Sequence, residues 1–174
     1  MKATTFLSIA YLISQESKCC VWKVGCVIAK NGRIISTGYN GTPSGTTNCC
    51  DYAKEQGWLD LKEKQFFKSE YRQEHSAWSA KHEIHAELNA ILYAAKNGLS
   101  IDGATMYITL SPCPDCVKAI TQSGIRQVVY CEQYDRAPSD WADLLKESGI
   151  AVTQIPKSRL VNLDWANIGN YYGD

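Results

Sequence analysis

From residue 84 onwards, segments with the apolar spacing of a helix alternate with short apolar runs that are typical of buried strands. In the first helical segment, 84–98, apolar residues recur every three or four positions, and Gly98 is placed to end the helix. Strands that alternate with helices predict a partly parallel sheet covered by helices on both faces. The series continues with a strand at 105–110, a helix at 113–123 that Pro112 opens and Gly124 ends, a strand at 127–131, a helix at 139–148 that Ser139 caps, and a strand at 150–155.

The N-terminal part of the chain predicts a helix followed by an antiparallel hairpin. Residues 2–17 place apolar side chains on one wide helical face. The run at 24–29 is almost continuously apolar, as in a strand buried on both faces. Asn31-Gly32 follows, and this pair is a strong signal for a two-residue hairpin turn. We therefore expect the return strand at 33–39, followed by a loop.

Residues 46–83 interrupt this regular order. The segment is charged and aromatic, and its apolar residues show weak periodicity. We expect an irregular insertion that is too short to hold a core of its own. The chain of 174 residues then forms a single domain over 1–174, because domains commonly contain about 100–200 residues.

Charge and cysteine content narrow the class of protein. Lys and Arg number 18 and so do Asp and Glu, whereas a protein that binds nucleic acid usually carries a basic excess. The apolar runs are too short to span a membrane, and the N-terminus lacks a cleavable signal pattern. A cytoplasmic location is therefore expected, and in a reducing compartment the eight cysteines are interpreted first as metal ligands.

Two short motifs carry the candidate chemistry: His-Ala-Glu at 85–87 and Pro-Cys-Pro-Asp-Cys at 112–116. Cys113 and Cys116 are three residues apart, so they share one face of the predicted helix. In its first turn, free backbone N–H groups favour the thiolate over the thiol. Two adjacent thiolates need a cation between them, and zinc suits this pair with His85 as the third ligand.

Three protein ligands leave a fourth position open, which is typical of a catalytic zinc site. Zinc lowers the pKa of water in that position to roughly 7. Glu87 lies two residues beyond His85, and at a helix N-terminus both side chains can lean toward the metal, so Glu87 is the expected general acid and base. The cysteine pair alone would also fit a redox pair or a zinc-stabilised binding module without catalysis.

The two motifs together resemble the H-x-E and P-C-x-x-C signature of zinc deaminases. More widely, the chain resembles deoxycytidylate (dCMP) deaminases of the zinc-dependent cytidine/deoxycytidylate deaminase family over most of residues 1–155. This resemblance implies a three-layer α/β/α sandwich on a five-stranded mixed sheet, which is the cytidine deaminase-like fold. The matching residues are Ser17-Lys18, Val24-Gly25, Gly-Tyr-Asn-Gly at 38–41, the segments 85–91 and 111–116, and, as in T-even-type bacteriophage members, Cys-Cys-Asp at 49–51 and Glu-Gln-Gly-Trp at 55–58.

The resemblance also implies an activity, namely hydrolysis of dCMP to dUMP and ammonia, which supplies dUMP for thymidylate synthesis. Glu87 would transfer the protons and Asn40 would hydrogen-bond the deoxyribose. Ser111 would offer backbone contacts to the base, and Tyr134 would reach the phosphate. A deaminase of the nucleoside or of another heterocycle is the alternative with the same chemistry, and acceptance of hydroxymethyl-dCMP stays open.

Regulation and assembly are implied by the resemblance in the same way. The family pattern is a homohexamer in the host cytoplasm, activated by dCTP and inhibited by dTTP, with Mg²⁺ accompanying the triphosphate. The loop at 42–48 is rich in Thr, Ser and Gly, and its backbone N–H groups could surround phosphates or serve only as a connector.

A second zinc is the other expectation that comes from the resemblance, with Cys19, Cys49, His75 and Glu83 as its ligands. A metal that closes the insertion onto the main body would reduce the conformational freedom of that segment. The sequence does not separate Cys19 from Cys20 or Cys49 from Cys50, and His82 competes with His75.

Overall fold

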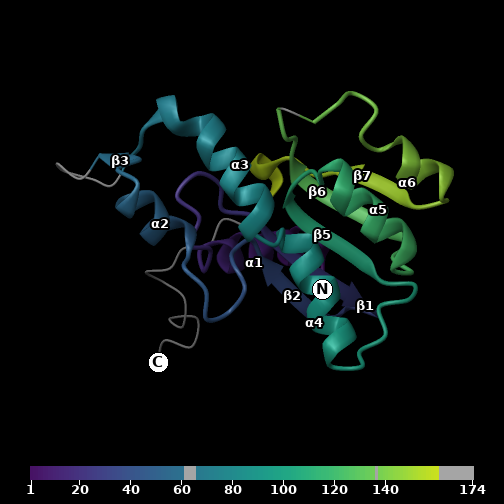
Figure 1. Cartoon of the computed structure of the whole chain (residues 1–174). Coiled ribbons are helices and arrows are strands. Elements are labelled where there is room, and N and C mark those ends of the chain that lie inside the picture. The colour runs from purple at the N-terminus through teal and green to yellow at the C-terminus, as the bar shows by residue number, and fades with distance from the viewer. Residues whose placement is uncertain (61–65, 136, 161–174) are drawn as a thin grey trace, which may run out of the picture.

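The computed structural model describes residues 1–60, 66–135 and 137–160, and its centre is a five-stranded mixed sheet in the order β2-β1-β5-β6-β7 (Figure 1). The pairs β2–β1 and β1–β5 are antiparallel, whereas β5–β6 and β6–β7 are parallel. The expected mixed five-stranded sheet is therefore confirmed. The strands are β1 (Gly25–Lys30), β2 (Arg33–Tyr39), β5 (Thr105–Leu110), β6 (Gln127–Glu132) and β7 (Ala151–Gln154).

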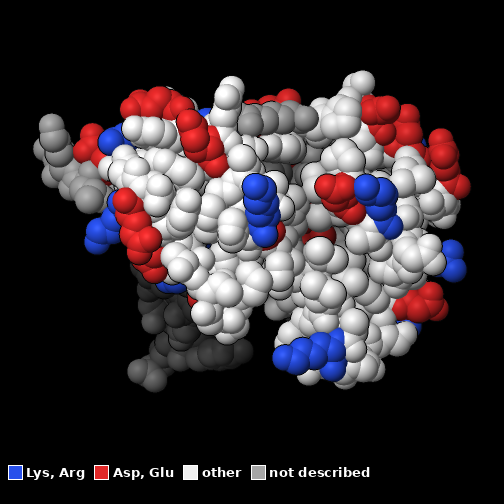
Figure 2. Space-filling view, viewed as in Figure 1, with Lys and Arg blue, Asp and Glu red and all other residues white. Residues whose placement is uncertain are grey.

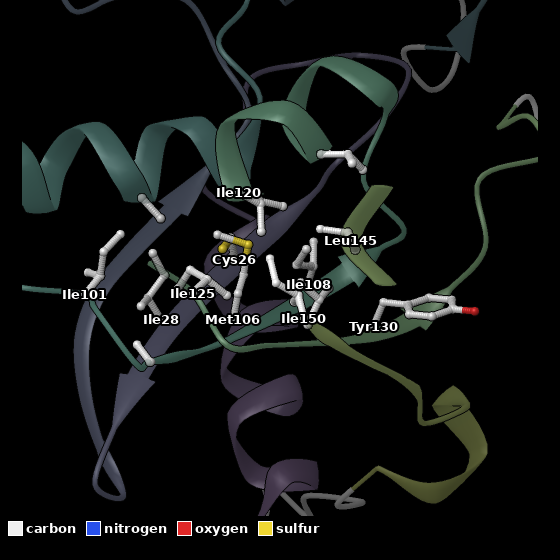
Figure 3. Packing of buried hydrophobic residues seen from close by; sticks show 14 of the residues in the cluster. Cys26, Ile28, Ile101, Met106, Ile108, Ile120, Ile125, Tyr130, Leu145 and Ile150 are labelled. Carbon is white, nitrogen blue, oxygen red and sulfur yellow. The ribbon is translucent and has the colours of Figure 1, made fainter. Parts of the chain in front are cut away.

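Helices cover both faces of this sheet, which confirms the three layers. On one face, α1 (Ala3–Ser14) places Phe6 and Ala10 against Val27 and Ala29 of β1. On the other face lie α4 (Ala86–Lys96), α5 (Pro114–Gln122) and α6 (Asp143–Glu147), which cover the largest apolar cluster. Figure 3 shows Ile120 of α5 beside residues of the sheet in this cluster.

The hairpin turn forms at the predicted pair. Asn31 and Gly32 have φ values of 53° and 74°, the left-handed conformation that a two-residue turn of this kind requires. The return strand β2 has the predicted bounds, and the register shifts between Ile28 and Ala29.

The residues that open α5 and α6 differ from the prediction. Cys113 is the N-cap of α5 and Pro114 takes the first helical position, so Pro114 rather than Pro112 opens this helix. The helix expected at 139–148 is shorter, because α6 begins after its N-cap Ala142 and residues 140–142 form turns. Ser139 therefore does not cap it.

The segment 46–83 is more regular than expected. It contains α2 (Cys49–Glu55), the two-stranded pair β3 (Leu59–Asp60) and β4 (Phe66–Phe67), the 3₁₀ turn η1 (Ser69–Tyr71) and α3 (Arg72–His82), while 61–65 lie outside the described residues. Its aromatic residues pack in a small apolar cluster that also includes Cys19 from outside the segment: Tyr52 stacks on Trp78 with ring centroids 4.7 Å apart, and Trp58 and Leu59 are buried beside them. Aromatic side chains bury enough area each to form a small core without strong periodicity.

Close packing and one isolated bridge fix the start of α4. A Cβ at Gly38 would lie 2.3 Å from the carbonyl oxygen of Ala86, so only glycine lets the first turn of α4 approach β2 this closely. Gly41 and Ile84 form an antiparallel bridge with N–O distances of 2.8 and 3.1 Å. His85 follows directly, so the sheet edge determines its position.

Within the described ranges, none of the helices has the length and apolarity that crossing a membrane requires.

Candidate active site

His85, Cys113 and Cys116 meet where α4 and α5 begin. His85 is the N-cap of α4, Cys113 is the N-cap of α5, and Cys116 lies in the first turn of α5. The Nδ1 atom of His85 is 3.3 Å from Sγ of Cys113 and 3.4 Å from Sγ of Cys116. The candidate ligand atoms of the three residues all lie within 4.8 Å of one another, close enough to share one ion.

The electrostatics of this trio favour a cation between the sulfurs. Hydrogen bonding from Cys116 lowers the pKa of Cys113 to about 4, while sharing that proton raises the pKa of Cys116 well above its usual range. The hydrogen bond with Cys113 raises the pKa of His85 to about 9. A metal ion can replace the protons that hold these three atoms together. Two sulfurs and one imidazole nitrogen are a donor set suited to zinc, so the residues fit this ion.

Glu87 lies in the first turn of α4, and its side chain is only 4% exposed. Burial raises the pKa of its carboxyl group to about 7, which suits a group that takes up and releases protons near neutral pH. Residues two apart on a helix point in different directions, but His85 has extended backbone angles, with φ −69° and ψ 156°. The two side chains therefore line the same cavity.

This cavity has a volume of about 300 Å³, and Asn40, Ser111 and Tyr134 also line it. Asn40 is buried, and its side-chain amide accepts from the backbone N–H of Val24 at 2.8 Å and donates to the carbonyl of Trp22 at 2.9 Å. Within the described part of the chain, one N–H and one lone pair of this amide stay available to a ligand. The three residues expected to contact substrate thus lie in one cavity with Glu87.

Ser111 and Tyr134 are connected to each other. The hydroxyl oxygen of Ser111 accepts a hydrogen bond from the backbone N–H of Tyr134 at 2.8 Å, and the N–H of Ser111 donates to the carbonyl of Glu132 at 2.8 Å. The backbone N–H of Ser111 is therefore used within the sheet, which leaves its carbonyl for contact with a base. Tyr134 is half-buried at the cavity wall.

Cys19, Cys49, His75 and Glu83 form a second cluster, and their candidate ligand atoms also lie within 4.8 Å of one another. Nε2 of His75 is 3.2 Å from Sγ of Cys49 and 3.6 Å from Sγ of Cys19. Oε2 of Glu83 accepts from Ser79 at 2.6 Å, whereas Oε1 is buried and has no hydrogen-bond partner among the described residues. An unpaired buried carboxylate oxygen is costly, and a cation here would satisfy it, so these residues fit a metal ion.

The competing residues lie outside this second cluster. Sγ of Cys20 is 3.5 Å from Sγ of Cys49 but is not among the four convergent atoms, and Cys50 is half-buried on α2. The ring of His82 stacks on Trp78, and its Nδ1 is 2.8 Å from the carbonyl of that residue. The four convergent atoms thus come from the predicted residues and not from Cys20, Cys50 or His82.

Trp22 and Arg72 are among the cavity residues that sequence reasoning missed. Arg72 begins α3 and shares one face of that helix with His75, Ser79 and Glu83. The spacing of three and four residues was a usable signal, because side chains at that spacing lie on one helical face. Recognising it required knowing that 72–82 is a helix, which the weak apolar periodicity did not indicate.

Comparison with known proteins agrees with this geometry. Residues 1–132 match the family model described as the cytidine and deoxycytidylate deaminase zinc-binding region. This range includes the two motifs that hold the first cluster, as well as the four residues of the second.

Relatives in sequence and structure extend the match over the chain. It is 58% identical to the deoxycytidylate deaminase of Enterobacteria phage T4 over 193 aligned positions, which cover all of both chains. The dCMP deaminase of the cyanophage S-TIM5 is similar in its apo form, with TM-score 0.67, 34% identity, and coverage of 89% of this chain and 100% of the other. Its complex with dCMP and dUMP gives TM-score 0.65, 36% identity, and coverage of 86% and 93%. The chain therefore belongs to the cytidine and deoxycytidylate deaminase family.

Proposed function

We propose that this protein hydrolyses dCMP to dUMP and ammonia. The observation that carries the proposal is the buried carboxylate of Glu87 beside a three-ligand cluster in one cavity. Among the described residues, that cluster holds three candidate ligands and not four, as a catalytic site requires. The similarity to phage enzymes named for dCMP, one of them solved with dCMP and dUMP, supports the choice of substrate.

His85, Cys113 and Cys116 would hold a zinc ion, which supplies a Lewis acid that makes water nucleophilic near neutral pH. Glu87 accepts a proton from the water that attacks C4 of the pyrimidine, and it delivers this proton to N3. Glu87 then passes the second proton of that water to the amino group as the C4–N bond breaks. Ammonia leaves, and the oxygen from water stays on C4. One buried carboxylate serves both transfers because its pKa of about 7 lies near the working pH.

The cavity walls support placement of the rest of the nucleotide. The free N–H of the Asn40 amide is available to the deoxyribose, and the Ser111 carbonyl is available to the base. Figure 2 shows Lys and Arg scattered among Asp and Glu on the face in view, without the basic stripe that a polynucleotide strand would need. A mononucleotide is therefore a better substrate than a polymer.

The second cluster supports a structural zinc. Cys19, Cys49, His75 and Glu83 offer four protein ligands, which is the number typical of a closed, structural site. They join the segment before β1 to α2 and α3, so an ion there would hold the insertion onto the main body. Glu83 also lies two residues before His85, which couples this site to the start of α4.

A homohexamer regulated by dCTP and dTTP, with Mg²⁺ on the triphosphate, completes the proposal. Exposed Leu92 (46%) and Tyr93 (53%) on α4 support a subunit contact, since large exposed apolar side chains next to one another favour association. Thr46 and Thr47, from the loop expected to surround phosphates, line a cavity of about 390 Å³ together with Lys81 and His82. A cation beside this loop supports binding of a phosphorylated effector.

The test is a direct comparison of dCMP with deoxycytidine as substrates of the zinc-loaded protein. We expect kcat/KM to be higher for dCMP by orders of magnitude, with dUMP and ammonia formed in equal amounts. Preference for deoxycytidine would indicate a nucleoside deaminase, and no release of ammonia from either would indicate a binding module.

A further inference from the structure

Arg72 lines the cavity of the candidate active site, although neither of the two sequence motifs includes it. It is the first residue of α3 and is half-buried, and it lies one helical turn before His75. Glu83 follows about three turns later on the same side of the helix. The face of α3 that lines the cavity therefore runs from a cation at one end to the catalytic region at the other.

The guanidinium of Arg72 stacks over the ring of Trp22, with 5.5 Å between Cζ and the ring centroid. Trp22 in turn packs edge-on against Tyr134, with centroids 5.9 Å apart, and its carbonyl is held by the Asn40 amide. Stacking fixes the plane of a guanidinium and leaves its N–H donors directed outward in that plane. A guanidinium with a fixed plane can donate two parallel hydrogen bonds to one oxyanion without first having to reorient.

No carboxylate of the described residues forms an ion pair with Arg72. The ion pairs of the described residues all involve lysine, and none of them includes Arg72. Of the Lys and Arg residues in ranges 1–60, 66–135 and 137–160, Arg72 alone lines this cavity. The acidic groups there are Glu83, Glu87 and Asp115, and Asp115 is paired with Lys118 at 2.7 Å.

The two ends of the cavity therefore carry opposite charge, positive beside Arg72 and negative beside the carboxylates. A dianionic phosphate would be repelled by the carboxylates near His85, and only the end beside Arg72 attracts it. The neutral pyrimidine carries no charge and suits the end with Glu87. A ligand with a base at one end and a phosphate at the other therefore has one favourable orientation.

We propose that Arg72, held by Trp22, binds the 5′-phosphate of the substrate and makes the enzyme prefer the nucleotide over the nucleoside. The inference rests on the proposed deaminase function. It places phosphate recognition on the insertion, on α3, and makes Tyr134 a neighbour that supports Trp22 instead of the principal phosphate ligand. Arg72 is a specificity-determining residue and takes no part in proton transfer.

The experiment compares the wild-type holoenzyme with Arg72→Gln, Arg72→Lys and a matched control, Arg33→Gln. Arg33 is exposed at the start of β2, about 20 Å along that strand from the end that leads into Asn40. For each protein, kcat and KM are measured with dCMP and with deoxycytidine. Zinc content and melting temperature are measured in parallel.

We expect Arg72→Gln to lose roughly 10- to 100-fold in kcat/KM for dCMP, mainly through KM, which is the scale for a lost hydrogen bond to a charged group. The preference for dCMP over deoxycytidine should fall by a similar factor. Deoxycytidine has no phosphate for Arg72 to contact, so its kcat/KM should stay unchanged. The kcat/KM of Arg72→Lys for dCMP should lie between those of the wild type and Arg72→Gln, since lysine keeps the charge but lacks the planar guanidinium with its paired N–H donors. Inorganic phosphate should inhibit deoxycytidine turnover by the wild type and do so more weakly with Arg72→Gln.

The outcomes separate this inference from the proposed function. If the wild type deaminates dCMP with strong preference and Arg72→Gln keeps that preference, the assignment of Arg72 is wrong while the enzyme activity stands. If the wild type does not deaminate dCMP, the proposed function itself fails. A loss in Arg72→Gln that is equal for both substrates, or a loss of zinc, would show a structural role and would also overturn the assignment.

Discussion

At the scale of single residues, the proposed hydrolysis depends on Glu87. Glu87→Gln keeps the size and the burial of the side chain and removes its ability to carry a proton. We expect this variant to retain the zinc held by His85, Cys113 and Cys116 and to lose about 10²- to 10⁴-fold in kcat, the usual scale for a general acid and base. Turnover of dCMP and zinc content, measured on the same preparation, check this. Near wild-type turnover would contradict the assigned role.

At the scale of elements, the second cluster joins α2 and α3 to the segment before β1, so a metal there would stabilise the insertion. We expect two zinc ions per chain in protein purified without chelator, and one in His75→Ala. An ion present at 100 times its Kd stabilises the folded state by about 2.7 kcal/mol, so the variant should unfold at a lower temperature.

His82→Ala is the matched control for this second site, because His82 lies on the same helix but outside the cluster. It should keep both zinc ions, although loss of its stacking on Trp78 is expected to cost about 0.5–1.5 kcal/mol. Metal analysis and thermal unfolding of the two variants give the comparison. A wild-type chain with a single zinc would refute the second site.

At the scale of the whole molecule, the apolar residues exposed on α4 and the second cavity beside the loop 42–48 predict assembly and regulation. We expect light scattering to give a hexamer and dCMP saturation curves to be sigmoidal. With Mg²⁺ present, dCTP should move the curve to lower dCMP concentrations and dTTP to higher ones, because each binds one conformation better than the other. Hyperbolic curves that neither triphosphate moves would exclude this regulation.

The sequence by itself determined the elements of the sheet and the three residues of the first candidate metal cluster. Local patterns suffice for these, because the apolar runs, the Asn31-Gly32 turn and the terminal residues of α4 and α5 act over a few positions. The sequence also placed His85 and the two cysteines at helix starts. The late start of α6 was not predictable in this way, because apolar spacing does not distinguish the turns at 140–142 from the first turn of a helix.

Only the tertiary structure decided which residues of the insertion face the cavity. His75 meets Cys19 across 56 residues, and Arg72 meets Trp22 across 50, so neither contact follows from local periodicity. Cys19, and not Cys20, is among the four convergent atoms, and both cysteines pack with residues of α2 and α3 in one apolar cluster. That packing comes from stacked aromatic rings such as Tyr52 and Trp78, whose geometry depends on the folded chain.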